Sequence, residues 1–152
     1  MMRLTVHTLA GRVAATLLIA AGMAAWSASG AAAAGAGSVA ITVHYKGSGT
    51  VDENHKLWVW VFDTPDIGPA AMPIREESIA KNGGEVTIRD LSEGRVWIAV
   101  AFDERGGSPG NQPPATGSPV GVYSVDGGQP SAVEPAEGTR VAVIFDDSMR
   151  MP

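Results

Sequence analysis

Residues 86–104 read VTIRDLSEGRVWIAVAFDE, and this stretch decides the fold. It holds one strand, a tight turn at residues 92–94, and then the longest apolar strand of the chain. Along residues 96–102 the large apolar side chains recur at every second position, which is the periodicity of a β-strand. Because both faces of this strand are apolar, we expect it to lie in the middle of a sheet and to be covered on both sides.

The rest of the chain carries similar signals, with short apolar stretches separated by turn-forming residues. Further strands are expected over residues 38–45, 56–62, 72–80, 85–89, 120–123, 132–134 and 139–145. The first of them suits the edge of a sheet, and residues 81–84 (KNGG) predict a hairpin. No helical period longer than two turns follows the N-terminal region. The sequence therefore predicts an all-β sandwich over residues 38–147 and a loose tail over residues 148–152.

The N-terminal residues have the composition of an export signal. Arg3 and Arg12 precede an apolar run over residues 13–25, and residues 27–36 are almost all small. We therefore expect a helical signal peptide with its cleavage region over residues 1–34, and a domain that works in the periplasm or outside the cell. A retained N-terminal anchor is the alternative, although the apolar run is shorter than a membrane-spanning helix needs.

The composition narrows the compartment and the partners. The chain has 152 residues and no cysteine, which excludes disulfides and thiolate metal sites. Export without disulfides favours a bacterial periplasm or medium. Cleavage of the signal would remove Arg3 and Arg12 and lower the net charge from −5 to −7. A domain this acidic lacks the basic surface that nucleic acids and anionic lipids need, so we expect neither nucleic acid nor, after cleavage, a membrane as a partner.

The order of elements in residues 86–103 is similar to that of a known group of secreted domains. A strand, a Leu-x-x-Gly turn and a long apolar strand ending in Asp103 resemble the core of carboxypeptidase-regulatory-like and prealbumin-like (transthyretin-like) domains. Glu137-Gly138 followed by a strand resembles their last hairpin. The resemblance covers residues 38–147 in layout. It implies a seven-stranded antiparallel Greek-key β-sandwich with an accessory or binding role and without catalytic residues.

Acidic residues follow two strands that are expected to end on the same side of the sandwich. Asp103, Glu104, Asp146 and Asp147 could together offer the oxygen ligands that calcium prefers. The alternative is that aspartate follows these strands because its side chain closes Asx turns. No other cofactor is expected. Some related-looking bacterial domains carry a calcium loop after the long strand, but here Arg105 stands where an oxygen ligand would be needed.

Two tryptophans form the second candidate site. Trp58 and Trp60 share one face of the strand at residues 56–62. If that face is exposed, the two rings could form a flat platform for sugar rings. The alternative is that they pack inside the domain or under the Gly- and Pro-rich loop at residues 106–119.

No catalytic constellation emerges from the sequence. There is no Gly-x-Ser-x-Gly motif, and adjacent carboxylates on a strand point apart, so they make poor acid-base pairs. We therefore expect a non-catalytic module that binds a protein or polysaccharide partner or plays a structural role. The alternatives are a carbohydrate-binding module that uses Trp58 and Trp60, and a calcium-dependent adhesion or assembly domain that uses the acidic residues.

Overall fold

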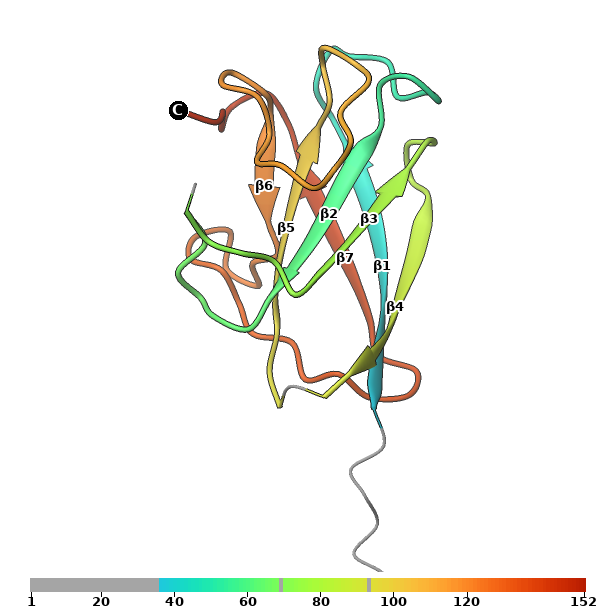
Figure 1. Ribbon diagram of the computed structural model, residues 1–152, viewed down its shortest axis with the longest axis vertical. Helices are drawn as coiled ribbons and strands as arrows, with labels where there is room; N and C mark the ends of the chain where they lie inside the picture. Colours follow the sequence, from blue (N-terminus) through green and yellow to red (C-terminus); the bar gives the residue numbers. More distant parts are fainter. Residues whose placement is uncertain (1–35, 69, 93) are drawn as a thin grey trace, which may run out of the picture. The chain divides into compact units, whose positions relative to one another are not determined.

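The computed structural model describes residues 36–68, 70–92 and 94–152, which form two β-sheets packed face to face (Figure 1). The predicted signal peptide, residues 1–34, lies outside the described residues. The strands are β1 (Gly37–Tyr45), β2 (Leu57–Phe62), β3 (Arg75–Ile79), β4 (Glu85–Leu91), β5 (Trp97–Phe102), β6 (Val120–Val122) and β7 (Arg140–Phe145). The prediction of an all-β sandwich is confirmed. Within the described part of the chain, no helix has the length and apolar character needed to cross a membrane.

The two sheets have three and four strands. The smaller has the order β4-β1-β7, and the larger has the order β3-β2-β5-β6. Strand neighbours run antiparallel except β1 and β7, which are parallel from Ala40 opposite Arg140 to Tyr45 opposite Phe145. The expectation of a wholly antiparallel fold is therefore wrong at this pair. Parallel neighbours need a long connection, and five strands separate β1 from β7 along the chain.

The core lies between the sheets and is built from alternate residues of the strands. The inward side chains of β1, β2 and β5 are fully buried, and Ile41, Val59 and Ile98 are each 0 % exposed. As predicted, β5 is central in its sheet, between β2 and β6. Its outer face is also covered in part, because Ala101 packs with Trp60 in a second, smaller apolar cluster.

The position of β1 differs from the prediction. β1 is the middle strand of the smaller sheet, not an edge strand. Its outward residues Thr42 and His44 are partly exposed because most of that face of the sheet is open to solvent, which gives a central strand the residue pattern of an edge strand.

The turn at residues 81–84 does not close a hairpin, because β3 and β4 belong to different sheets. Gly83 takes a positive φ of 73°, as the sequence indicates, but the turn carries the chain across the sandwich. Asn82 then binds the end of β1: its Oδ1 accepts the Tyr45 N–H at 2.9 Å, and its Nδ2 donates to the Tyr45 carbonyl at 2.7 Å. Local residue preferences determine the turn, whereas contacts between distant segments determine which sheet the next strand joins.

The C-terminal tail is not loose. Met149 and Met151 lie alongside residues 117–120: Val120 N–H donates to the Met149 carbonyl at 2.9 Å, and Met151 N–H donates to the Ser118 carbonyl at 2.9 Å. Without the tail, the backbone N–H and C=O groups at the start of β6 would lack these hydrogen bonds. The backbone of the tail supplies their partners. The strand expected over residues 132–134 is reduced to a single bridge between Val96 and Val133.

Candidate functional site

The outer face of β2 positions the two tryptophans. Leu57, Val59 and Val61 point into the core, so Trp58 and Trp60 point to the other side of the sheet, as predicted. Their rings are stacked, with centroids 6.3 Å apart and planes inclined by 25°. The rigid strand therefore presents two nearly parallel aromatic surfaces at a fixed spacing.

The loop at residues 103–119 covers these rings and is shaped by Asp103. Asp103 Oδ1 accepts the Gly106 N–H at 3.0 Å, and Oδ2 accepts the Ser108 N–H at 2.8 Å. Gly110 then reaches the tryptophans, where its carbonyl accepts the Trp60 Nε1–H at 3.1 Å. Gly110 has a φ of 82° and lies so close to Trp58 that a Cβ there would be 2.0 Å from the indole Cζ3. Only glycine allows this approach.

A cleft of about 260 Å³ remains between the loop and the tryptophan face. Its walls include Trp58 and Trp60, the prolines of the loop, and the polar side chains of Arg105 and Gln112. The Nε1–H of Trp58 is buried here and has no hydrogen-bond partner among the described residues. A buried donor without an acceptor is unusual in a folded protein. The cleft therefore has apolar ring surfaces on one wall, and Trp58, which provides one of them, keeps a buried donor without an acceptor.

The tryptophans do not form the open platform that one hypothesis required. Trp60 is only 6 % exposed, and Trp58 is half-buried. The two tryptophans instead pack beneath the Gly- and Pro-rich loop at residues 106–119, as the alternative expected. The flat backbone around Gly110 can lie against an indole, so the loop occupies the surface that a sugar would need on an exposed platform.

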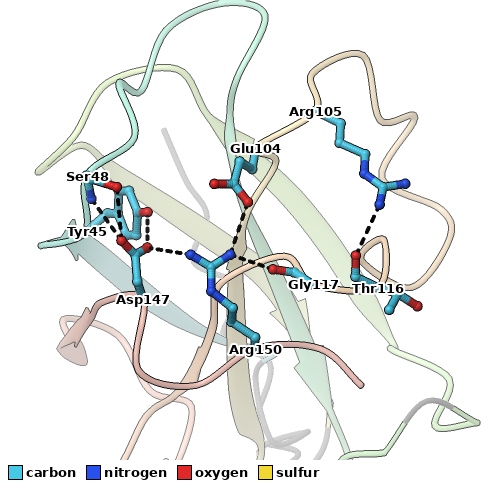
Figure 2. Close-up of polar contacts among 8 residues, drawn as sticks. All are labelled: Tyr45, Ser48, Glu104, Arg105, Thr116, Gly117, Asp147 and Arg150. Carbon is cyan, nitrogen blue, oxygen red and sulfur yellow. Dashed lines mark hydrogen bonds and ion pairs between the residues drawn. The ribbon is translucent and has the colours of Figure 1, made fainter.

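Two of the four acidic residues, Glu104 and Asp147, lie on either side of an arginine that the sequence analysis did not single out (Figure 2). Arg150 Nη1 lies 3.1 Å from Glu104 Oε2 and donates to the Gly117 carbonyl at 2.7 Å. Arg150 Nη2 lies 3.6 Å from Asp147 Oδ1. The guanidinium thus joins the acids after β5 to those after β7 and holds the tail against residues 117–120. The signal that could have revealed it is a single basic residue in the tail, shortly after the acids at 146 and 147.

Asp147 is further tied to the end of β1. It accepts a hydrogen bond from the Tyr45 hydroxyl, and its Oδ2 accepts the Ser48 N–H at 3.0 Å and the Ser48 hydroxyl at 3.2 Å. The bonds from Tyr45 and Ser48, together with Arg150, hold the pKa of Asp147 below its usual value. Burial, then the bond to Asp147, raises the pKa of Tyr45 to about 12. The site is therefore an ionised carboxylate held by neutral and cationic donors.

The four predicted calcium ligands are not gathered into one group. Asp103 closes the turn of its own loop, and Asp146 Oδ1 accepts the Ser148 N–H at 2.8 Å; hydrogen bonds from Ser148 lower the pKa of Asp146. Glu104 and Asp147 do come together, but Arg150 lies between them. Among the residues that the structure describes, no three His, Asp or Glu side chains are close enough to hold a metal ion. The Asx-turn alternative thus accounts for Asp103 and Asp146.

The raised pKa of Tyr45 predicts a loss of stability in alkali. Between pH 10 and pH 12 an unfolded chain ionises its tyrosine while the folded chain keeps Tyr45 protonated, so the free energy of unfolding falls as pH rises through this window. Tyr45→Phe cannot ionise and should show a smaller fall over the same window. Urea unfolding measured at pH steps from neutral to alkaline gives both slopes. Equal slopes for the two proteins would contradict this assignment, and Tyr123→Phe is the control for tyrosine ionisation elsewhere.

Comparison with known proteins adds no relative to this description. The chain matches no family model, and searches of the curated proteins and of the solved structures gave no match. What the structure establishes is an all-β domain of seven strands in two sheets, with a tryptophan-walled cleft on the larger one.

Proposed function

We propose that this chain is an exported, non-catalytic binding module of the carboxypeptidase-regulatory-like, prealbumin-like type, active in the periplasm or outside the cell. Two features support the family type. β4 lies beside β1 and β5 beside β2, so sheet neighbours are distant in sequence, as a Greek-key path requires. The Leu-x-x-Gly sequence, residues 91–94, falls between the start of β4 and the start of β5, where the resemblance would have it. Export rests on the composition of residues 1–34.

The observation that carries the binding role is the cleft over β2. It has aromatic walls from Trp58 and Trp60, and the buried Nε1–H of Trp58 has no acceptor within the described residues. Binding sites for small ligands are concave and mostly apolar, with a few polar groups that orient the ligand. The cleft is concave and pairs aromatic and proline walls with a larger share of polar groups, and Asp103 and Gly110 give it a fixed outline.

A saccharide is the ligand class that this cleft fits best. A sugar ring has an apolar C–H face suited to an indole, and its hydroxyls can hydrogen-bond the polar side chains of Arg105 and Gln112 in the wall of the cleft. The volume of about 260 Å³ suits a small number of sugar rings entering at the exposed side of Trp58. The partner is then the end or a short segment of a polysaccharide, not a long flat chain.

Titration with soluble oligosaccharides tests this proposal. The probes are β-1,4-linked oligomers of glucose, xylose and N-acetylglucosamine, followed by tryptophan fluorescence and calorimetry. Trp58→Ala should raise the dissociation constant of the bound oligomer at least about tenfold, a loss of about 1.4 kcal/mol. Trp97→Ala is the matched control, because Trp97 is also half-buried but does not line the cleft. No binding by any oligomer, or equal weakening in the two variants, would contradict the saccharide assignment.

A further inference from the structure

The second inference concerns an edge of the smaller sheet and is independent of the cleft. In the order β4-β1-β7, β7 is hydrogen-bonded only to β1. Among the described strands, none pairs with its other side. An open strand edge presents unpaired N–H and C=O groups that can pair with a further strand.

The phase of the ladder shows which residues face this open edge. Ala40 N–H donates to the Thr139 carbonyl, and Lys46 N–H donates to the Phe145 carbonyl, so odd-numbered residues of this segment direct their backbone groups toward β1. Because this direction alternates along a strand, Arg140, Ala142 and Ile144 direct theirs toward the open edge. The side chains of these three residues are exposed, and Ile144 is 65 % exposed.

The other sheet edges are protected, whereas no segment among the described residues covers that of β7. β3 carries the charged run Arg75-Glu76-Glu77, and β6 is flanked by the C-terminal tail at its start. β4 ends near Asp90, whose positive φ of 57° interrupts a regular edge. β7 reads RVAVIF, with no proline or lysine and a charge only at its first residue. Charges, bends and covering segments are the usual means of preventing edge pairing, so their absence from β7 is informative.

We propose that two copies of this chain pair through β7, antiparallel across a two-fold axis at Val143. In this register Ala142 of one copy lies opposite Ile144 of the other. Both residues direct their backbone groups to the interface, so the hydrogen-bond phase matches. A two-fold contact requires a surface that complements itself.

Charge at the two ends of β7 favours this occupant and this register. Arg140 begins the strand and Asp146 follows its end, so the antiparallel copy brings Arg140 opposite Asp146 at both ends of the interface. The Arg140 side chain is 70 % exposed and contacts Glu85 at 2.6 Å, which leaves most of its guanidinium accessible. Within the described part of the chain, Asp146 accepts hydrogen bonds from Ser148 alone, which leaves acceptor positions on its two carboxylate oxygens for a guanidinium. Opposite charges directly across a strand pair are stabilising, and like charges are destabilising.

Charge reversal tests the register without depending on any one variant. Arg140→Asp and Asp146→Arg each place like charges opposite one another, and each should weaken the dimer of the full chain by about tenfold. An equimolar mixture of the two variants should pair again, because the aspartate introduced in one variant then faces the arginine introduced in the other. Sedimentation equilibrium over a range of concentrations measures all three samples. Glu85→Gln is the control for the bond that Arg140 makes within its own chain.

A backbone substitution tests the edge itself. Ala142→Pro removes an N–H that points away from β1, so the fold should persist while the dimer is lost. Ala142→Ser keeps that N–H and should remain dimeric. Far-ultraviolet circular dichroism verifies that the proline variant is folded; if it is not, the charge-reversal mixture alone decides. A monomeric wild-type chain at high micromolar concentration overturns the proposal, as does a dimer that neither the charge reversals nor a folded proline variant weakens.

Discussion

Replacing Phe102 with alanine is expected to lower the free energy of unfolding by about 4 kcal/mol. The ring is 2 % exposed and stacks on Tyr45, with centroids 4.6 Å apart and planes inclined by 24°. Gly49 also lies so close that a Cβ there would be 2.1 Å from the ring. We expect the strands around the ring to hold their positions, so that a cavity remains and the cost lies toward the high end for such changes. Urea unfolding at neutral pH measures the loss.

The control for Phe102 is an apolar residue outside the core. Val125 is 73 % exposed, and Val125→Ala should change the free energy of unfolding by less than about 0.5 kcal/mol. A loss below about 1 kcal/mol for Phe102→Ala would show that the site collapses around the truncated side chain. Phe102 also immediately precedes Asp103, whose carboxylate shapes the loop over the tryptophans. The same variant should therefore bind oligosaccharide more weakly than the wild-type chain.

Gly110→Ala is expected to displace the loop from the tryptophan face and to cost about 3 kcal/mol. Two effects add together. The residue has a φ of 82°, which an L side chain rarely adopts, and its Cβ would overlap the Trp58 ring. The hydrogen bond from Trp60 Nε1 to the Gly110 carbonyl should be lost with the contact. Urea unfolding gives the stability change, and near-ultraviolet circular dichroism reports the tryptophan environment.

Gly107→Ala separates the two effects because Gly107 has a φ of 75° with open space around its Cβ position. This variant introduces the backbone strain without a clash. It should lower the free energy of unfolding by about 1 kcal/mol and leave the near-ultraviolet circular dichroism of the tryptophans unchanged. If the two alanine variants lost the same stability, contact with Trp58 would not be what constrains Gly110. The expected difference ties the outline of the cleft to this single close approach.

The strands were predictable because their determinants are local. The alternation in β1, β2, β5 and β7 follows directly from the residues, and the inward sets are buried as expected. The turn at residues 81–84 was also predictable from Asn82 and Gly83. Each of these features depends on neighbours within a few residues, so no knowledge of the rest of the fold is needed to find it.

The candidate site was only partly predictable. Trp58 and Trp60 were identified as a pair on one strand face, but their cover is a loop about fifty residues further along the chain. Likewise Glu104 and Asp147 were expected at the same end of the sandwich, yet the cation between them is Arg150, a residue of the tail. The hydrogen bonds between Asn82 and Tyr45 were not predictable either, because the two residues are far apart in sequence. All of these contacts join segments that are far apart in sequence.

By itself the sequence determined that this protein is an all-β sandwich, which residues face its core, and that its net charge is negative. These properties follow from periodicity, turn chemistry and net charge, which are additive along the chain. The tertiary structure decided that β1 is central and parallel to β7, that the tryptophans border a cleft, and that one edge of β7 pairs with no other described strand. These properties depend on which distant segments meet. The free energy gained when such segments are buried together comes from residues far apart in sequence, so no local sequence pattern reveals it.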